Sequence, residues 1–317
     1  MRDLGAADGA DDRAEVSDPP SGPVRPIRSR SPMPIDAAKA LAAEPRSGEI
    51  SWTAKDVLLY HLGIGAGIPA TDPGELRYTL ESRLQVLPSF ATVAGSGAPG
   101  VISGLSMPGI EVELARVLHG GQTLEIHRPL PVEGTATTVN RIAAVYDKGK
   151  AAVLVLRTEV ADEDGPLWTN DSQIFIKGEG GWGGDRGPSA RLEPPTGEPD
   201  KTVERTLRED QALLYRLSGD WNPLHADPDF AAQAGFDRPI LHGLCTYGVT
   251  LKSVVDTLLG GEASRVRSYA TRFAGVVFPG ETLRIRMWDQ GDTVRVTVTA
   301  VDRDDAPALT DTVVRHV

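Results

Sequence analysis

Residues 213–228 read LLYRLSGDWNPLHADP, and this stretch predicts a tight polar turn between two helices. Gly219 is a typical helix end, and a regular helix cannot continue through Pro223, because proline has no backbone N–H. The pair Asp227–Pro228 then provides an N-cap and a first-turn proline for the next helix. The turn carries three polar side chains that we expect to converge: those of Asp220, Asn222 and His225.

A carboxylate and an imidazole on one loop can hold a water molecule and move its protons near neutral pH. We therefore take Asp220 and His225 as the candidate catalytic pair and Asn222 as a candidate substrate-binding residue. The spacing of five residues between the aspartate and the histidine also allows a purely structural interpretation. In it, Asp220 caps a turn and His225 is a surface histidine.

Residues 239–246, PILHGLCT, place Gly243 just before an apolar helix. Apolar residues recur at intervals of three and four from Thr246 to Leu259, which predicts that helix. Glycine lets a ligand approach closely, and the N–H groups of a helix N-terminus favour developing negative charge. This arrangement suits the oxyanion of an enolate. We expect His242 to orient the turn before Gly243, with direct substrate contact as the alternative.

The composition divides the chain into a tail, two domains and a linker. Residues 1–48 have no aromatic side chain and are rich in proline, so they bury too little apolar surface to order and predict a disordered tail. Residues 178–201 are rich in glycine and proline and predict a linker. The expected domains are residues 49–177 and 202–317.

The two domains show the same order of elements. LLYHL at residues 58–62 corresponds to LLYRL at residues 213–217, 155 positions later. Strands with alternating hydrophobicity follow in each domain, which favours antiparallel ribbons with one buried face. A sheet that wraps a buried helix is an α+β unit, although the helix is weaker in the first half, where Pro88 interrupts residues 84–93. The expected strands span residues 122–129, 135–145, 151–161, 173–177, 265–277, 282–288, 293–301 and 309–317.

Several of these stretches resemble one known family. The two segments quoted above, with VFPGETL at residues 277–283, are similar to the MaoC-like, type 2 (R)-specific enoyl-CoA hydratases. LHGGQ at residues 118–122 and RPLP at residues 128–131 resemble the hydratase unit of the peroxisomal multifunctional enzyme. The resemblance implies a double hot-dog fold, in which two units form a pseudo-dimer within one chain. Association of two such chains into a homodimer stays open.

The resemblance also implies a reaction: reversible syn addition of water to trans-2-enoyl-CoA, giving (R)-3-hydroxyacyl-CoA in fatty-acid or steroid side-chain β-oxidation. By resemblance, Asp220 and His225 activate the water and relay a proton to the α-carbon. Asn222 orients that water, and the Gly243 amide holds the thioester oxygen. Arg272, on a predicted strand, could meet the CoA phosphates, with a solvated strand arginine as the alternative.

Two other functions stay open beside the hydratase. One is dehydration of 3-hydroxyacyl chains on acyl carrier protein, which uses the same residues in reverse. The other is non-catalytic binding of acyl thioesters, which would not need the intact acid and base pair. In each case the expected partner is an acyl thioester, which for the hydratase is acyl-CoA. No cofactor is expected.

The first half lacks the acid and base pair. At the offset of 155 residues, its counterparts of the aspartate, asparagine and histidine are Gly65, Gly67 and Ala70. Asp56 and His61 share the spacing but fall inside a helical segment, where five residues rotate by roughly 140°. We expect both on the surface without a catalytic role. The chain is therefore expected to hold one active site, with small first-half residues that widen the groove for bulky acyl tails.

Charge and histidine spacing argue against other classes. The chain has 33 basic and 44 acidic residues, a formal net charge of −11, so nucleic-acid and membrane binding are not expected. The six histidines show no metal-ligand spacing, so no metal is expected. The single cysteine, Cys245, is expected in the core. Without a signal peptide or a membrane-length apolar run, we expect a cytoplasmic protein.

Overall fold

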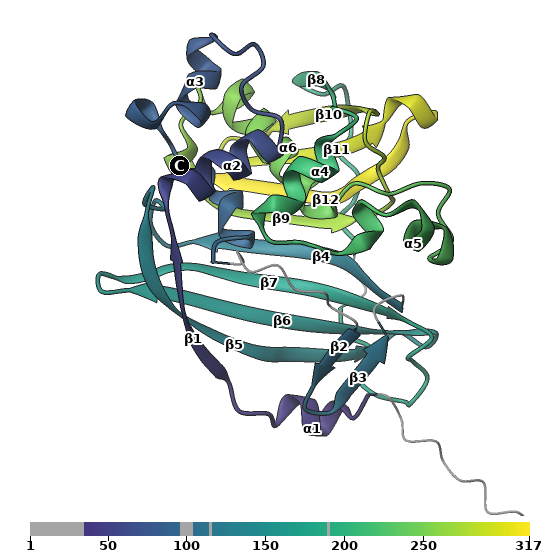
Figure 1. The fold of residues 1–317 in the computed structure, drawn as a ribbon. Helices are drawn as coiled ribbons and strands as arrows, with labels where there is room; N and C mark the ends of the chain where they lie inside the picture. The colour runs from purple at the N-terminus through teal and green to yellow at the C-terminus, as the bar shows by residue number, and fades with distance from the viewer. Residues whose placement is uncertain (1–34, 96–103, 114–115, 189–190) are drawn as a thin grey trace, which may run out of the picture. The chain divides into compact units, whose positions relative to one another are not determined.

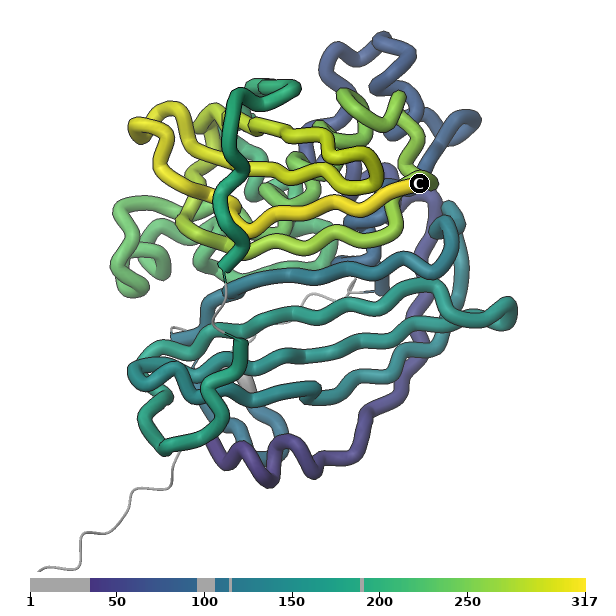
Figure 2. The backbone as a smooth tube through the Cα atoms, turned by 180° about the vertical axis from the view of Figure 1, so that it is seen from behind, coloured from purple at the N-terminus to yellow at the C-terminus, as the bar shows by residue number. Residues whose placement is uncertain are grey.

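The computed structural model describes residues 35–95, 104–113, 116–188 and 191–317. They form a ten-stranded antiparallel sheet with helices packed against it (Figure 1), and the sheet is seen from behind in Figure 2. In spatial order its strands are β1 (Arg46–Trp52), β5 (Gly134–Asp147), β6 (Ala151–Asp162), β7 (Gly165–Lys177), β4 (Val117–Ile126), β9 (Val266–Phe273), β12 (Ala306–His316), β11 (Thr293–Ala300), β10 (Thr282–Asp289) and β8 (Lys201–Thr206).

Helices and short elements connect these strands. The α-helices are α1 (Ala37–Leu41), α2 (Ala54–Gly63), α3 (Pro73–Thr79), α4 (Gln211–Tyr215), α5 (Pro228–Gln233) and α6 (Gly243–Leu258). The 3₁₀ turns are η1 (Glu81–Arg83), η2 (Pro88–Thr92), η4 (Arg216–Ser218), η5 (Pro223–His225), η6 (Ala263–Arg265) and η7 (Val301–Arg303). Strands β2 (Gly104–Met107) and β3 (Ile110–Glu113) pair separately. Among the described residues, every helix is too short or too polar to cross a membrane.

The two halves join at β4 and β9, which pair antiparallel with Gly121 opposite Arg272. Outward from this seam the order is β7-β6-β5-β1 on one side and β12-β11-β10-β8 on the other, so each half repeats the same arrangement. The outermost strands begin at Arg46 and Lys201, separated by the same 155 positions as the pentapeptide repeat. The expected α+β architecture with antiparallel sheets is confirmed.

α6 is the central helix of the second half and is buried along most of its length. It begins at Gly243, three residues before the predicted start at Thr246. Tyr247 of α6 stacks on Tyr269 of β9 with ring centroids 3.8 Å apart, and each hydroxyl donates to the other residue's backbone carbonyl. Each large apolar side chain buried in this way contributes roughly 1.5–3 kcal/mol. This packing fixes the N-terminus of α6.

The described residues of the first half contain no helix as long as α6. A helix cannot run through Pro88, which instead begins the single turn η2. The end of α2 packs on α6 instead: a Cβ on Gly248 would lie 2.6 Å from both Tyr60 and Ile64, so only glycine allows this approach. The first half therefore packs against the central helix of the second half.

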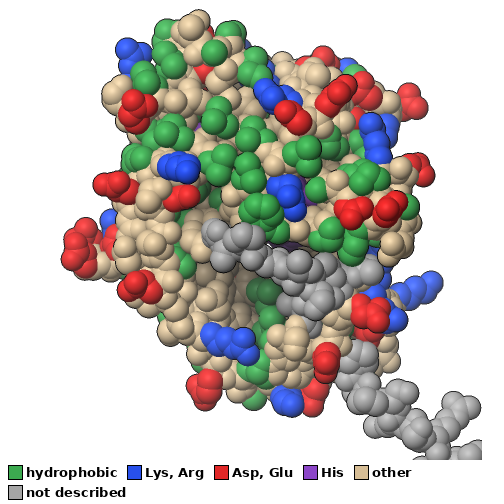
Figure 3. All heavy atoms as spheres, in the orientation of Figure 1, with side chains coloured by type: hydrophobic (Ala, Val, Ile, Leu, Met, Phe, Trp, Pro, Cys, Tyr) green, Lys and Arg blue, Asp and Glu red, His purple; other side chains and the backbone are tan. Residues whose placement is uncertain are grey.

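The two copies of the pentapeptide repeat lie in equivalent positions. Their tyrosines, Tyr60 and Tyr215, are buried with ring centroids 6.1 Å apart. Leucines of the same helical segments point outward, and Leu62, Leu213 and Leu217 are exposed. Figure 3 shows apolar side chains gathered on the face that carries α2 and α4. The repeat thus buries one face of each helix and leaves apolar residues on the other.

The predicted disordered tail, residues 1–48, is too long at its C-terminal end. Residues 1–34 lie outside the described part of the chain, but α1 and the start of β1 fall inside the predicted tail. Ile35 and Ala40 are buried in a small apolar cluster with Ile110 of β3. Tertiary contacts that composition does not reveal therefore order this segment.

The predicted linker separates β7 from β8. Between Lys177 and Lys201 the described residues form no helix or strand. The Asp147 carboxylate anchors the beginning of this segment, because it accepts the backbone N–H groups of Gly181 and Gly183 at 2.8 and 2.7 Å.

Candidate active site

The polar turn after α4 is held by its own side chains. Gly219 has φ +123°, a conformation that L side chains rarely adopt, and it ends the helical segment. The Asp220 carboxylate accepts the backbone N–H of Asn222 at 3.2 Å, and the side-chain Oδ1 of Asn222 accepts the backbone N–H of Leu224 at 3.0 Å. Pro223 begins η5, as its missing N–H requires. The turn therefore has a defined shape without a ligand.

His225 ends η5 and is buried. Its Nδ1 lies 2.8 Å from the carbonyl oxygen of Ile240, which can only accept, so Nδ1 carries the proton. In the neutral ring, Nε2 then carries a lone pair that can accept a proton. The same hydrogen bond fixes the orientation of the ring, as a general base requires.

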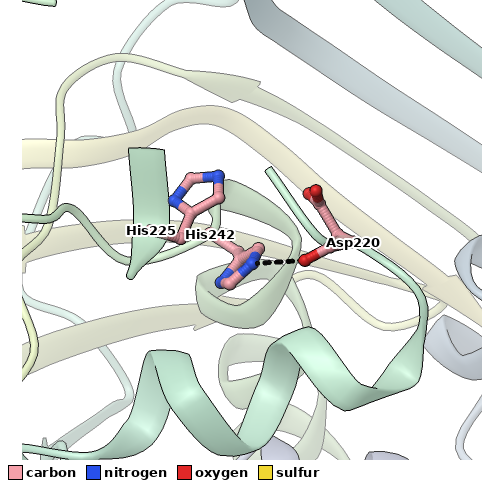
Figure 4. A group of neighbouring side chains, drawn as sticks. All are labelled: Asp220, His225 and His242. Atoms are coloured by element: carbon pink, nitrogen blue, oxygen red, sulfur yellow. Dashed lines mark hydrogen bonds between the residues drawn. The ribbon is translucent and has the colours of Figure 1, made fainter. Parts of the chain in front are cut away.

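His242 connects the turn to α6. It is the N-cap residue of that helix, and its Nε2 lies 3.2 Å from the backbone oxygen of Asp220, the bond drawn in Figure 4. Its ring stacks on His225 with centroids 3.7 Å apart. His242 thereby ties the backbone of Asp220 to the start of α6 and supports the ring of His225.

Burial keeps both imidazoles neutral. It lowers the pKa of His225 below its usual value, and the negative charge of Asp220 offsets only part of this effect. Burial, followed by the neighbouring His225, holds the pKa of His242 well below its usual value. At pH 7, His225 is therefore a neutral base beside a carboxylate.

Gly243 supplies the expected N–H group at the start of α6. As the first residue of α6, it has no intrahelical acceptor for that N–H. A Cβ at this position would lie 3.1 Å from the Phe273 ring of β9, so a side chain would crowd the helix start. The site thus combines a base, a carboxylate and a helix N-terminus.

A cavity of about 820 Å³ opens beside His225. Phe278 lines it, and the guanidinium groups of Arg238 and Arg303 lie 4.7 and 5.4 Å from the Phe278 ring. Arg303 is paired with Glu281, whereas Arg238 is exposed. His225 is therefore within reach of a ligand that enters from this side.

Both halves match known domains. Residues 191–306 match the family model of the MaoC like domain, and residues 50–178 match that of the MFE-2 hydratase 2 N-terminal domain. Enoyl-CoA hydratase ChsH3 of Mycobacterium tuberculosis is 48% identical over 278 residues, which cover 87% of this chain and 97% of that protein. The chain belongs to the MaoC-like hydratase 2 family.

Solved structures confirm the fold. A MaoC-like dehydratase from Phytophthora capsici superposes with a TM-score of 0.79 at 31% identity, over 89% of this chain and 98% of that one. A Mycobacterium tuberculosis protein described as a double hotdog fold has a TM-score of 0.53 at 15% identity, over 89% of this chain and 98% of its own. The expected double hot-dog fold is confirmed.

The MaoC-like site also has the composition of a metal-binding group. One ligand atom from each of Asp220, His225 and His242 lies within 4.8 Å of the others. Ligands of a tetrahedral zinc would be about 3.4 Å apart, since each lies about 2.1 Å from the ion. Because the two imidazole rings are stacked, they do not converge on a point. Spacing along the chain did not predict this cluster, because His242 lies 17 positions after His225.

The structure brings together five of the six candidate site residues, and Arg272 is the exception. Tyr269 and Phe273 of β9 face α6, so Arg272 lies on the opposite face of this strand by the alternation of side chains. It does not line the cavity beside His225. The expected contact between Arg272 and the CoA phosphates stays a prediction.

The first half of the MaoC-like chain differs from expectation at His61. This residue is wholly buried rather than on the surface. Its Nδ1 lies 2.9 Å from the backbone oxygen of Tyr78, and its Nε2 accepts the backbone N–H of Leu87. Its two nitrogens are thus used by the backbone of the same half. Asp56 is exposed and caps α2 through Thr53.

One further histidine, His119, lies near the site, and its role was not predicted from the sequence. His119 belongs to β4 of the first half, and its ring centroid lies 4.8 Å from that of Phe273, the ring that packs against Gly243. The available signal was the pair Gly120–Gly121 inside a strand pattern, which is typical of a bulge next to a functional residue.

Proposed function

We propose that this protein hydrates trans-2-enoyl-CoA to (R)-3-hydroxyacyl-CoA, in the β-oxidation of fatty-acyl or steroid side-chain thioesters. One observation carries the proposal: the side chains of Asp220 and His225 meet at the turn that His242 ties to the N-terminus of α6 at Gly243. The site thus holds groups that activate water beside a group that stabilises an enolate. The name of the 48% identical relative, enoyl-CoA hydratase, supports the same reaction.

The water is held between the Asp220 carboxylate and His225 Nε2. The Asn222 side-chain oxygen is occupied by the N–H of Leu224, so its amide group is left to donate to the water. The water loses a proton to the acid and base pair, and its oxygen forms the bond to C3. The same pair returns a proton to C2, so one molecule of water is added in total.

Gly243 stabilises the charge that develops during this step. As the C3–O bond forms, electron density moves to the thioester oxygen, which becomes enolate-like. The free N–H at the start of α6 donates to this oxygen, and the helix end favours its negative charge. The loss of such a donor typically slows a reaction by about 10²–10³-fold.

The first half provides space for the acyl tail. A cavity of about 240 Å³ lies in this half, lined by Ala91 of η2, Trp168 of β7 and Leu244, the residue after Gly243. Thr92 and Ala94, at and just after the end of η2, line it as well. An acyl chain with its thioester at Gly243 can therefore continue into this half.

Dehydration of 3-hydroxyacyl thioesters is the second candidate. The superposable Phytophthora capsici protein is named a MaoC-like dehydratase. Because hydration is reversible, the same groups serve both directions, and the carrier of the acyl chain distinguishes the two functions.

The decisive assay follows the ultraviolet absorbance of the conjugated enoyl thioester. With crotonyl-CoA and longer or branched enoyl-CoA substrates, absorbance is expected to fall, and an (R)-specific 3-hydroxyacyl-CoA dehydrogenase should oxidise the product. Faster turnover of carrier-protein thioesters would favour the dehydratase. The absence of turnover on every chain length would refute both enzymes and favour a thioester-binding protein.

A further inference from the structure

Strand β7 forms one wall of the first-half cavity of about 240 Å³. Three of its residues, Ser172, Asn170 and Trp168, line the cavity, and they alternate along the strand so that they share one face. Ser172 lies opposite Gln122 of β4, and Trp168 lies opposite Val160 of β6, and both of these partners line the cavity as well. Four positions separate Ser172 from Trp168, which in an antiparallel strand is roughly 14 Å. The cavity is therefore deep in the direction of β7.

The Gln122 end of this cavity is the end nearer to the candidate active site. At the seam, where β4 and β9 lie side by side (Figure 1), Gln122 is opposite Thr271, two residues before Phe273. The Phe273 ring is the group that packs against Gly243. Because β4 and β9 are antiparallel, the direction from Gln122 to Phe273 leads away from Trp168, which lies opposite the last residue of β4. Trp168 therefore lies at the end of the cavity that is far from the thioester.

Trp168 is held in place at this far end. It is 1% exposed, and its ring meets that of Trp52 edge-on with centroids 5.7 Å apart. The Trp52 indole N–H donates to the backbone oxygen of Pro131 at 3.0 Å. A Cβ on Gly134 would lie 2.9 Å from the Trp52 ring, so β5 packs closely against it. Trp168 therefore has little freedom to move when a ligand reaches it.

We propose that Trp168 sets the longest acyl tail that this protein accepts, with the thioester at Gly243 and the methyl end of the tail against the indole ring. The proposal rests on the hydratase function proposed above and adds the length of its substrate. Up to the ring, each further methylene buries apolar surface and is worth about fourfold in affinity. A longer tail would have to displace a packed aromatic pair, so affinity falls beyond this length.

The test measures kcat/KM on a series of linear substrates: crotonyl-CoA, trans-2-octenoyl-CoA, trans-2-dodecenoyl-CoA and trans-2-hexadecenoyl-CoA. Trp168→Leu makes the far end of the cavity deeper, and Trp168→Phe does so to a smaller extent. Leu167→Ala is the matched control, because Leu167 is fully buried beside Trp168 in β7 but does not line the cavity. For each protein, kcat/KM on a longer substrate is divided by kcat/KM on crotonyl-CoA, so that a change in the amount of folded enzyme cancels.

In the wild type, we expect this ratio to rise with chain length and to fall once the tail outgrows the cavity. For the first substrate at which the wild-type ratio falls, Trp168→Leu should raise the ratio by about tenfold or more, since room for two further methylenes is worth about that factor. Trp168→Phe should raise the ratio by less. Leu167→Ala should keep the wild-type ratio although its unfolding midpoint is lower, because it leaves a void outside the cavity.

Three results would overturn the role of Trp168 alone. The first is a wild-type ratio that keeps rising through trans-2-hexadecenoyl-CoA, the second is the wild-type ratio in both Trp168 variants, and the third is an equal change in Leu167→Ala. If Trp168→Leu does not fold, Trp168→Phe decides between these outcomes. A wild type that is inactive on every substrate would instead refute the hydratase function and this proposal with it.

Discussion

His225 works as a base because its other nitrogen is occupied. The hydrogen bond from Nδ1 to Ile240 leaves Nε2 unprotonated, and burial lowers the pKa of the ring below its usual value of 6.5. Activity requires the neutral form, which persists down to the lowered pKa. We therefore expect the acid limb of the pH profile of kcat/KM to have its midpoint below 6.5. A midpoint above 6.5 would contradict this protonation state.

Removal of either member of the pair should abolish most activity without unfolding the protein. We expect Asp220→Asn and His225→Gln each to lower kcat/KM by about 10²–10⁴-fold, the usual contribution of a positioned acid or base. Asp229→Asn is the matched control, because Asp229 is an exposed carboxylate in the first turn of α5. Crotonyl-CoA hydration measures the effect, and a loss below tenfold in both variants would be incompatible with proton transfer by these groups.

Single residues show clearly where sequence reasoning is sufficient. Gly219 and Pro223 act through their own backbones, so the turn that holds Asp220 could be predicted locally. The partner of His225 could not, because Ile240 lies 15 positions away. The burial of His61 was missed for the same reason, since its partners come from later segments.

Elements from the two halves are joined by a buried charge network. Lys252 of α6 pairs with Glu75 of α3 at 2.7 Å and with Asp256 at 2.8 Å, and Tyr78 donates to the other Asp256 oxygen. Lys252 is almost fully buried, so its removal leaves two carboxylates without their cation. This network fastens α3 to the central helix.

Lys252→Met should therefore destabilise the protein strongly. Removal of one partner of a buried ion pair typically costs about 3–5 kcal/mol. We expect the free energy of unfolding in urea to fall by about 3 kcal/mol, because Glu75 and Asp256 retain some access to water. Lys55→Met, at an exposed site, should change it by less than about 0.5 kcal/mol. Equal stability of the two variants would show that the network contributes little.

Elements with a strong local pattern were predictable, and those that depend on distant contacts were not. The alternating strands β5, β6, β10 and β11 lie close to their predicted ranges. α1 was missed because its apolar residues gain their stability from Ile110, which is distant in sequence. The pair Gly120–Gly121 could have indicated a bulge, but its register depends on the partner strand β7.

At the scale of the whole molecule, one sheet makes the two halves a single structural unit. Leu124 of β4 is fully buried and lies opposite Tyr269 of β9 at the seam. A charge there would be buried without a partner, at a cost of several kcal/mol. A defect at the seam therefore affects both halves.

Leu124→Asp should lower the unfolding midpoint and remove hydratase activity together, although Leu124 belongs to the half without the acid and base pair. Glu125→Gln, a change at the next and exposed position, should preserve both. Calorimetry and the crotonyl-CoA assay measure the two effects. If Leu124→Asp lost first-half structure while activity stayed intact, the halves would be independent.

The stereochemistry of the reaction tests the central claim most directly. Asp220 and His225 lie within 4.8 Å of each other, so the pair adds oxygen and returns the proton on the same face of the substrate. When crotonyl-CoA is hydrated in deuterium oxide, NMR of the product should show an (R)-hydroxyl at C3 with deuterium on the same face of C2. Deuterium on the opposite face, or an (S)-hydroxyl, would contradict the assignment of these two side chains.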